Sequence, residues 1–540
     1  MLFNSIEFTL FLPAAFLLYW FVTRRSLRAQ NLLLWVAGYV FYGWWDWRFL
    51  LLLAASTLID YFVAQQIGRH EEDAPRKRWL YVSLFAQLGM LGVFKYFDFF
   101  ITSWVDAWAS VGVTMHLPTL HVILPVGISF YTFQTLSYVL DVYRGKLEPC
   151  KDLITFGAFI SFFPQLMAGP IERASHMLPQ FSKPRVFDEA QAIAGIRLII
   201  WGFFKKVAVA DNCGVYVDQV FAAPDNYSGI TLVLGAVMFA FQIYGDFSGY
   251  SDIAIGTGKL FGFELMSNFR VPYFSRTISE FWKRWHISLS TWFQDYLFMP
   301  LAIQFRNLRK WGVALAVFLT FLVSGIWHGA NWTFVIWGAY HGLLLASEQG
   351  LRAILPAKLP EAESPWHLRQ LPMIVLTFLL VTLGLVFFRA ASVPDAFHYL
   401  GRIPTALKSG ALYLPATRSL VYLGVLLALD IWYRKDERAP LAQGTTRWVK
   451  SIAHAPDHLR WRRVDTPMRL HSFASNSDAK VPEKNGSRNR QIGGGLPRTG
   501  NHGAFIASGE LAHLPKNEHD RVFFTCSRPR RQSSGATNTM

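Results

Sequence analysis

The sequence predicts an all-α protein that crosses a membrane many times. Hydrophobic residues make up 52% of the 540 residues and charged residues only 16%, below the roughly 25% that is usual for soluble domains. The 46 Phe and 20 Trp residues suit surfaces that face lipid and the aromatic belts at membrane interfaces. Apolar runs follow one another as far as residue 433. We therefore expect roughly 10 to 12 transmembrane or re-entrant helices.

The formal net charge of +16 does not indicate a nucleic-acid-binding protein. More than half of the excess lies in residues 434–540, and the chain contains no zinc finger, RNA-binding signature or basic heptad region. Basic cytoplasmic loops and a polar tail explain the charge equally well. The cysteines Cys150, Cys213 and Cys526 form no Cys-x-x-Cys pair, which argues against a disulfide framework or a thiolate metal site.

Four apolar segments open the chain, and the loops between them predict its orientation. The segments cover residues 6–23, 31–45, 49–67 and 79–101. No basic region precedes the first, so we expect a retained helix rather than a cleaved signal peptide. Loops 24–28 and 69–78 are rich in Arg and Lys. If the two segments between them both cross the membrane, these loops lie on the same side of it. The positive-inside rule makes that side cytoplasmic and places the N-terminus outside.

The next two segments, 120–141 and 153–170, carry Pro, Gly and polar residues at membrane depth. Broken helices of this kind are tolerated only inside the protein or beside a water-filled cavity. Helix packing through small residues explains them, and so does a tunnel wall; the two interpretations are compatible. Segments 190–222 and 230–263 follow.

Segment 230–263 contains two carboxylates and several close glycines. Asp246 and Asp252 either cap broken helices, pair with a basic neighbour or line a tunnel. No histidine accompanies them at ligand spacing, so we expect no metal site. Two pairs of glycines have the GxxxG spacing that permits close helix packing: Gly245 with Gly249, and Gly258 with Gly262.

Residues 275–298 predict an amphipathic helix in the membrane interface. Glu280 and Arg284 fall on its polar face. The apolar face contains Trp282, His286, Leu289 and Phe293. A lone histidine on an apolar face is more often a packed core residue than a catalyst, so this pattern alone leaves the role of His286 open.

His328 is the strongest candidate for chemistry. It ends the apolar run 311–327, and the run 331–345 follows after Gly329. Ionisable groups at membrane depth are costly and usually face a cavity or a partner. A neutral imidazole, with a reference pKa of about 6.5, suits a general base. The alternative is a histidine that packs between helices and bonds to a backbone carbonyl. The last apolar segments are 371–388 and 418–433.

Five sequence blocks, in order, resemble the membrane-bound O-acyltransferase family. They are Leu124–Gln134 (LPVGISFYTFQ), Pro164–Ile171 (PQLMAGPI), Asp246–Gly256 (DFSGYSDIAIG), Glu280–Ser290 (EFWKRWHISLS) and Ser324–Trp332 (SGIWHGANW). The resemblance covers residues 1–433. It implies a helical membrane fold with a tunnel, through which an acyl group passes from a cytoplasmic thioester donor, acetyl-CoA or an acyl carrier, to a hydroxyl on the far side. No bound cofactor is expected.

The resemblance also implies roles for single residues. His328 aligns with the family's active-site histidine, and His286 aligns with a second histidine near the donor path. Further candidates for the tunnel or the donor site are Trp285, Ser290, Asp246, Trp327 and Asn331. The side chain of Asn331, or backbone amides beside Gly329, are candidate oxyanion donors.

The branch of the family that these blocks resemble modifies exported polysaccharides such as alginate. A multi-pass location in the cell inner membrane follows, with periplasmic acetyltransferase proteins as partners that accept the acetyl group. Other acceptors remain open, namely teichoic acid for D-alanyl transfer and peptidoglycan for O-acetylation. A transporter would predict internal repeats, which the sequence does not show, and a non-catalytic export scaffold is the third alternative.

Two regions depart from the family pattern. Residues 302–307 replace a Gly-Gly-Asn segment that often follows the Met-Pro-Leu motif at residues 299–301, which leaves the acceptor polymer open. Residues 434–540 contain no apolar run long enough to span, although relatives usually end in a further hydrophobic helix. We expect this polar, basic tail to be mostly disordered. A shifted reading frame near residue 440 would also explain its composition.

Overall fold

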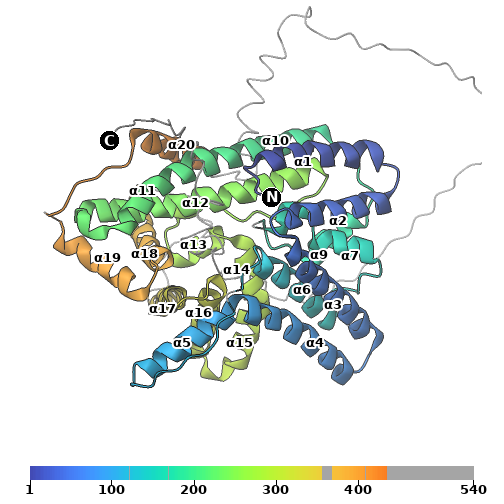
Figure 1. Cartoon of the computed structure of the whole chain (residues 1–540), viewed down its shortest axis with the longest axis horizontal. Helices are drawn as coiled ribbons and strands as arrows, with labels where there is room; N and C mark the ends of the chain where they lie inside the picture. The colour runs from blue at the N-terminus through green and yellow to red at the C-terminus, as the bar shows by residue number, and fades with distance from the viewer. Residues whose placement is uncertain (121, 168, 355–367, 408, 434–540) are drawn as a thin grey trace, which may run out of the picture. The chain divides into compact units, whose positions relative to one another are not determined.

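The computed structural model describes residues 1–433 apart from 121, 168, 355–367 and 408, and within these residues it is helical, with no strand (Figure 1). The helices are α1 (Ile6–Leu17), α2 (Leu27–Gly43), α3 (Leu50–Arg69), α4 (Asp73–Leu91), α5 (Phe97–Ala109), α6 (Ile128–Tyr143), α7 (Leu153–Ile160), α8 (Phe163–Leu166), α9 (Ala174–Phe181), α10 (Glu189–Phe203), α11 (Asp211–Ala222), α12 (Gly229–Leu260), α13 (Ile278–Arg284), α14 (Ile287–Phe293), α15 (Met299–Gln304), α16 (Lys310–His328), α17 (Trp332–Ile354), α18 (Leu371–Arg389), α19 (Val393–Thr405) and α20 (Thr417–Tyr433).

Five helical runs in the described part of the chain are long and apolar enough to cross a membrane. They are Trp47–Arg69, Asp73–Ala109, Gly229–Leu260, Lys310–His328 and Leu371–Arg389. A shorter apolar run covers Ile6–Val22. The prediction of an all-α, polytopic membrane protein is confirmed. The other predicted segments are also largely helical, and segments 120–141 and 153–170 are broken, as their Pro and Gly residues led us to expect.

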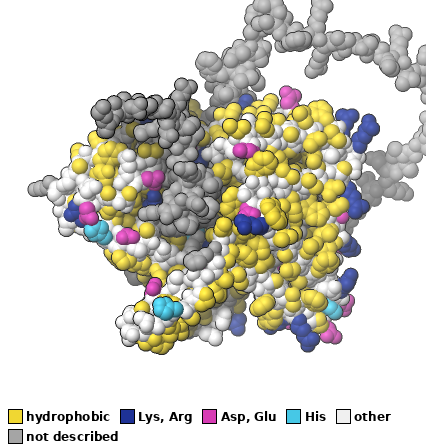
Figure 2. All heavy atoms as spheres, in the orientation of Figure 1, with side chains coloured by type: hydrophobic (Ala, Val, Ile, Leu, Met, Phe, Trp, Pro, Cys, Tyr) yellow, Lys and Arg dark blue, Asp and Glu magenta, His cyan; other side chains and the backbone are white. Residues whose placement is uncertain are grey.

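The surface of these helices suits lipid. Hydrophobic side chains cover much of the face shown in Figure 2, and Ile6, Phe85 and Trp311 are among the large apolar residues most exposed to solvent. The turns from α1 to α2 and from α3 to α4 lie on the same edge of Figure 1, where Lys and Arg side chains gather in Figure 2. This arrangement supports a common, cytoplasmic side for the two Arg-rich loops.

Close packing of α12 against α10 depends on glycine. A Cβ atom added at Gly249 would lie 2.7 Å from the carbonyl oxygen of Gly202, and one at Gly245 would lie 2.9 Å from that of Lys205. The first predicted GxxxG pair therefore marks a helix contact. The second pair does not, because Gly262 lies beyond the end of α12 in a left-handed turn with φ of 78°.

The predicted amphipathic helix over residues 275–298 is interrupted. α13 ends at Arg284, and α14 begins at Ile287. Glu280, which was placed on a water-facing side, is buried and forms ion pairs with Arg276 at 2.9 Å and Arg284 at 3.1 Å. The prediction of one continuous helix is therefore wrong: the chain leaves helical geometry at Trp285 and His286, and Glu280 is paired inside the protein rather than facing water.

Three helices were not predicted from the sequence: α9, α15 and α19. The first two are short, with 8 and 6 residues, and short helices give a weak periodic signal. The predicted polar tail over residues 434–540, and with it the idea of a shifted reading frame, lies outside the described residues.

Candidate active site

His328 is the last residue of α16 and is buried. Its ring packs edge-on against Trp327, with ring centroids 4.9 Å apart, and against Trp337 of α17, also at 4.9 Å. Phe388 of α18 lies 5.7 Å away. Gly329, the next residue, is extended, and a Cβ atom there would lie 2.1 Å from the ring of Phe334. Three helices and a tightly packed glycine therefore enclose this imidazole.

His286 lies in the break between α13 and α14 and is fully buried. Its backbone is left-handed, with φ of 43° and ψ of 55°. A residue other than glycine in this region costs about 1–3 kcal/mol, and such residues concentrate at functional sites. The following backbone amides hold the conformation: Ile287 N–H donates to the carbonyl of Asn268 at 2.9 Å, and Ser288 N–H donates to the Asn268 side chain at 3.2 Å.

One aromatic cluster connects the two histidines. Phe130 of α6 lies 6.3 Å from the ring of His286 and 5.9 Å from the ring of Trp327. Trp327 in turn contacts His328. Phe247 of α12 closes the other side of His286 at 4.6 Å. Residues 42 positions apart in the sequence therefore line the same packed region.

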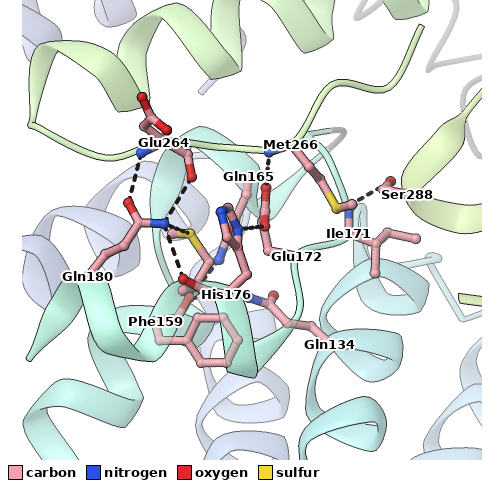
Figure 3. Close-up of polar contacts among 11 residues, drawn as sticks. Gln134, Phe159, Gln165, Ile171, Glu172, His176, Gln180, Glu264, Met266 and Ser288 are labelled. Atoms are coloured by element: carbon pink, nitrogen blue, oxygen red, sulfur yellow. Dashed lines mark hydrogen bonds and ion pairs between the residues drawn. The ribbon is translucent and has the colours of Figure 1, made fainter. Parts of the chain in front are cut away.

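A polar network supports the start of α14 (Figure 3). The Ser288 hydroxyl accepts from the N–H of Ile171 at 2.9 Å. The adjacent Glu172 is buried, accepts from the N–H of Met266 at 2.5 Å, and lies 2.8 Å from Nδ1 of His176. Burial raises the pKa of Glu172, and the hydrogen bond to Glu172 raises the pKa of His176. Ile171 and Glu172, in the loop before α9, are thus hydrogen-bonded both to the start of α14, after His286, and to the loop after α12.

Trp285 and Ser290 have mainly supporting contacts. The Trp285 ring packs against Phe269, in the loop after α12, with ring centroids 5.1 Å apart, and against Phe281 of α13 at 5.5 Å. The Ser290 hydroxyl donates to the carbonyls of Trp282 and Trp285, each at 3.2 Å. Ser290 therefore satisfies carbonyl groups at the end of α13, where the helix breaks.

Asp246 is part of an ion-pair network. Lys206, in the π-helical segment Phe204–Ala210, lies 2.8 Å from Asp246 and 2.9 Å from Asp211. Lys205 pairs with Asp252 at 2.6 Å. Of the three interpretations that the sequence left open for these carboxylates, the contacts favour pairing with a basic neighbour. In the part of the chain that the structure describes, no three His, Cys, Asp or Glu residues are grouped so that they could hold a metal ion.

Asn331 begins α17. Its side-chain oxygen accepts from the N–H of Thr333 at 3.0 Å, and its amide donates to the carbonyl of Ala391 at 3.0 Å. These contacts cap the helix and fasten it to the turn after α18. One of the two N–H groups of the Asn331 amide therefore serves the helix connection; the other, like the backbone amides beside Gly329, remains a candidate oxyanion donor.

Two buried residues near His328 were not among the predicted site residues. His341 lies four residues after Trp337 on α17 and packs against that ring, with centroids 4.9 Å apart. Lys95, in the π-helical segment Gly92–Tyr96, contacts the carbonyl of Trp327. An ionisable residue inside an apolar run was the available signal for both.

Comparison with known proteins relates the chain to one family. The model of the membrane-bound O-acyltransferase family (MBOAT) matches residues 150–362, a range that includes His286 and His328. The chain is 42% identical over 410 residues to a Pseudomonas aeruginosa protein named probable alginate O-acetylase AlgI, covering 74% of each. It is 36% identical over 439 residues to the Helicobacter pylori peptidoglycan O-acetyltransferase, covering 74% of this chain and 79% of that protein. It is 30% identical over 238 residues to the Bacillus subtilis teichoic acid D-alanyltransferase, covering 43% and 60%.

Proposed function

Since the chain belongs to the membrane-bound O-acyltransferase family, we propose that it transfers an acetyl group from a cytoplasmic thioester donor to hydroxyls of an exported polysaccharide. The chain is a multi-pass membrane O-acyltransferase; the acceptor, the donor and the direction are the proposal. The observation that carries the proposal is the 42% identity, over 74% of its length, to a protein named for alginate acetylation. Acetyl-CoA or an acyl carrier is the donor, and the cell inner membrane is the location.

In the proposed mechanism, His328 is the general base. Its imidazole accepts the proton of the acceptor hydroxyl while the hydroxyl oxygen attacks the thioester carbonyl carbon. The new C–O ester bond forms, the C–S bond of the donor breaks, and the thiol leaves with the proton that the imidazole returns. General-base assistance of this kind is typically worth about 10²–10⁴-fold in rate. The burial of His328 between Trp327 and Trp337 supports the assignment, because excluding water protects the donor from hydrolysis.

His286 acts on the donor side in this proposal. Its left-handed backbone and its contact with Phe130, which also contacts Trp327, support a path that leads from the α13–α14 break toward His328. Backbone amides beside Gly329 supply hydrogen bonds to the oxyanion, which can contribute about 10²–10³-fold. The acceptor hydroxyl of this step belongs to a periplasmic partner protein, which then passes the acetyl group to a hydroxyl of the polymer.

Peptidoglycan is the second candidate acceptor. It is supported by 36% identity over 79% of the length of the Helicobacter pylori protein. D-alanyl transfer has less support, because the similarity to the Bacillus subtilis protein covers only 43% of this chain. The same His328 would act in all three reactions, so the residues around it do not separate the acceptors.

Compositional analysis of the cell envelope tests the proposal. Exported polysaccharide, peptidoglycan and teichoic acid are isolated from cells with the gene, without it and with it restored. Ester-linked acetate and D-alanine are then measured in each polymer. We expect acetate to disappear from the exported polysaccharide alone and to return on complementation. Loss of acetate from peptidoglycan alone would show that peptidoglycan is the acceptor. Unchanged acetate in every polymer would refute both acceptors.

A further inference from the structure

Lys95 is a buried cation within the helical run Asp73–Ala109. It belongs to the π-helical segment Gly92–Tyr96, which separates α4 from α5. A π-helical turn inside an α-helix is rare and occurs frequently at functional sites. A charged side chain at membrane depth is costly and persists where it serves a partner inside the protein. These two unfavourable features coincide at a single position.

The Lys95 ammonium contacts the end of α16. It donates to the carbonyl oxygen of Trp327 and, at 3.2 Å, to the hydroxyl of Ser129 at the start of α6. It also lies 5.4 Å from the centre of the Trp327 ring, within the range of a cation–π contact. The neighbouring Tyr96 hydroxyl donates to the carbonyl of Ile326 at 3.0 Å. The π-helical turn thus presents two successive side chains to the last carbonyls of α16.

These contacts act on the residue before His328. The last carbonyls of a helix have no intrahelical donor and carry its partial negative charge, so a cation there stabilises the helix end. A hydrogen bond from an ammonium is also stronger than one between neutral groups. Lys95 therefore restrains both the backbone and the indole of Trp327, and that indole packs on the imidazole of His328 at 4.9 Å.

Ser129, the second hydrogen-bond partner of Lys95, connects this lysine to the surroundings of His286. Ser129 is fully buried, and the next residue, Phe130, contacts the rings of His286 and Trp327. Lys95 consequently links the π-helical turn between α4 and α5 to α6 and α16, at the place where the two histidines share an aromatic cluster.

We propose that Lys95 is a positioning residue for acyl transfer, whose ammonium holds the Trp327–His328 end of α16 in its reactive orientation. The proposal rests on the function proposed above. Charge, rather than volume, is the property that matters: methionine has nearly the shape of lysine and would preserve packing, but it cannot donate a hydrogen bond. Arginine retains the charge and the donors on a larger group.

The test compares Lys95→Met and Lys95→Arg in cells that lack the chromosomal gene. The initial rate of ester-linked acetate formation on exported polysaccharide is measured per amount of tagged protein in the membrane. A misplacement of about 1 Å can cost about 10²-fold in rate, so we expect Lys95→Met to lose about that much. Lys95→Arg should be at least several-fold faster than Lys95→Met, a rescue that a purely space-filling role would not produce. Lys77→Met, at an exposed position of α4, is the matched control and should keep the wild-type rate.

The outcomes separate this inference from the proposed function. If the unmodified chain adds no acetate, the proposed function fails, and the assignment of Lys95 fails with it. If the unmodified chain is active but Lys95→Met matches it, only the assignment of Lys95 is overturned. Should Lys95→Met fail to accumulate in the membrane, Lys95→Gln replaces it, because glutamine is neutral but still donates hydrogen bonds. A wild-type rate in that variant would also overturn the role of the charge.

Discussion

Gly329→Ala tests the packing that encloses His328. Gly329 is extended, with φ of −165°, a conformation that alanine adopts easily, so the substitution adds volume without backbone strain. The new Cβ would lie 2.1 Å from Cε2 and 2.3 Å from Cδ2 of Phe334. Non-bonded carbon atoms prefer about 3.5–4.0 Å, so the ring must move by more than 1 Å.

A displaced Phe334 ring would press on the packing around the site. Phe334 is fully buried and packs edge-on against Phe388 at 4.9 Å, and Phe388 packs against His328 at 5.7 Å. Overpacking of this kind costs about 1–3 kcal/mol of stability, which a large membrane domain tolerates. A shift of about 1 Å at the reacting group can lower the rate by about 10²-fold. We therefore expect Gly329→Ala to accumulate in the membrane and to lose about 10–10²-fold in acetyl transfer.

The assay is the initial rate of ester-linked acetate formation on exported polysaccharide, normalised to the protein in the membrane. Gly350→Ala is the matched control, because it lies on α17 and its added Cβ would meet no atom within 4 Å. That variant should keep the wild-type rate. Wild-type transfer by Gly329→Ala would refute the claim that this packing positions His328.

Three further predictions follow from other contacts. His286→Asn should keep the fold, since asparagine tolerates the left-handed backbone, but should lose about 10²-fold or more in acetate formation; a wild-type rate would contradict it. Lys206→Met removes the ammonium from Asp246 and Asp211 and should destabilise the protein by about 3–5 kcal/mol, seen as a lower unfolding temperature in detergent; an unchanged temperature would contradict it. His176 has a raised pKa in the fold, so its contribution to stability is complete below about pH 6.5 and is lost as the pH rises through the raised value. The unfolding temperature should therefore fall as the pH rises above about 6.5, and His176→Asn should reduce that fall; an equal fall in the variant would exclude His176 as its source.

The sequence predicted α16 well because its limits are encoded locally. The predicted apolar run 311–327 compares with an observed helix of Lys310–His328. Basic residues precede the run and a glycine follows it, so composition changes sharply at both ends. The position of His328 at the junction of two helices followed directly.

The break at His286 could not be predicted in the same way. Helical periodicity continues through Trp282, His286 and Leu289, so local pattern favours one helix. The helix ends because Asn268 accepts from the amides after His286, and those hydrogen bonds depend on the tertiary fold. Tertiary context also explains Asn331, whose amide donates to Ala391, 60 residues later in the sequence.

Lys95 shows a signal that sequence reasoning passed over. In the predicted segment 79–101, Lys95 and Asp98 are the only charged residues, and an ionisable residue within such a run indicates a partner inside the protein. The identity of that partner required the fold, because Trp327 lies 232 residues away.

His328→Ala is the most direct test of the proposed chemistry. The variant removes the imidazole but leaves α16 and its packing partners in place. Acetate on exported polysaccharide is measured alongside the amount of protein in the membrane. We predict normal insertion with acetyl transfer lowered by about 10²–10⁴-fold. Wild-type acetate in this variant would contradict the role of His328 as the base.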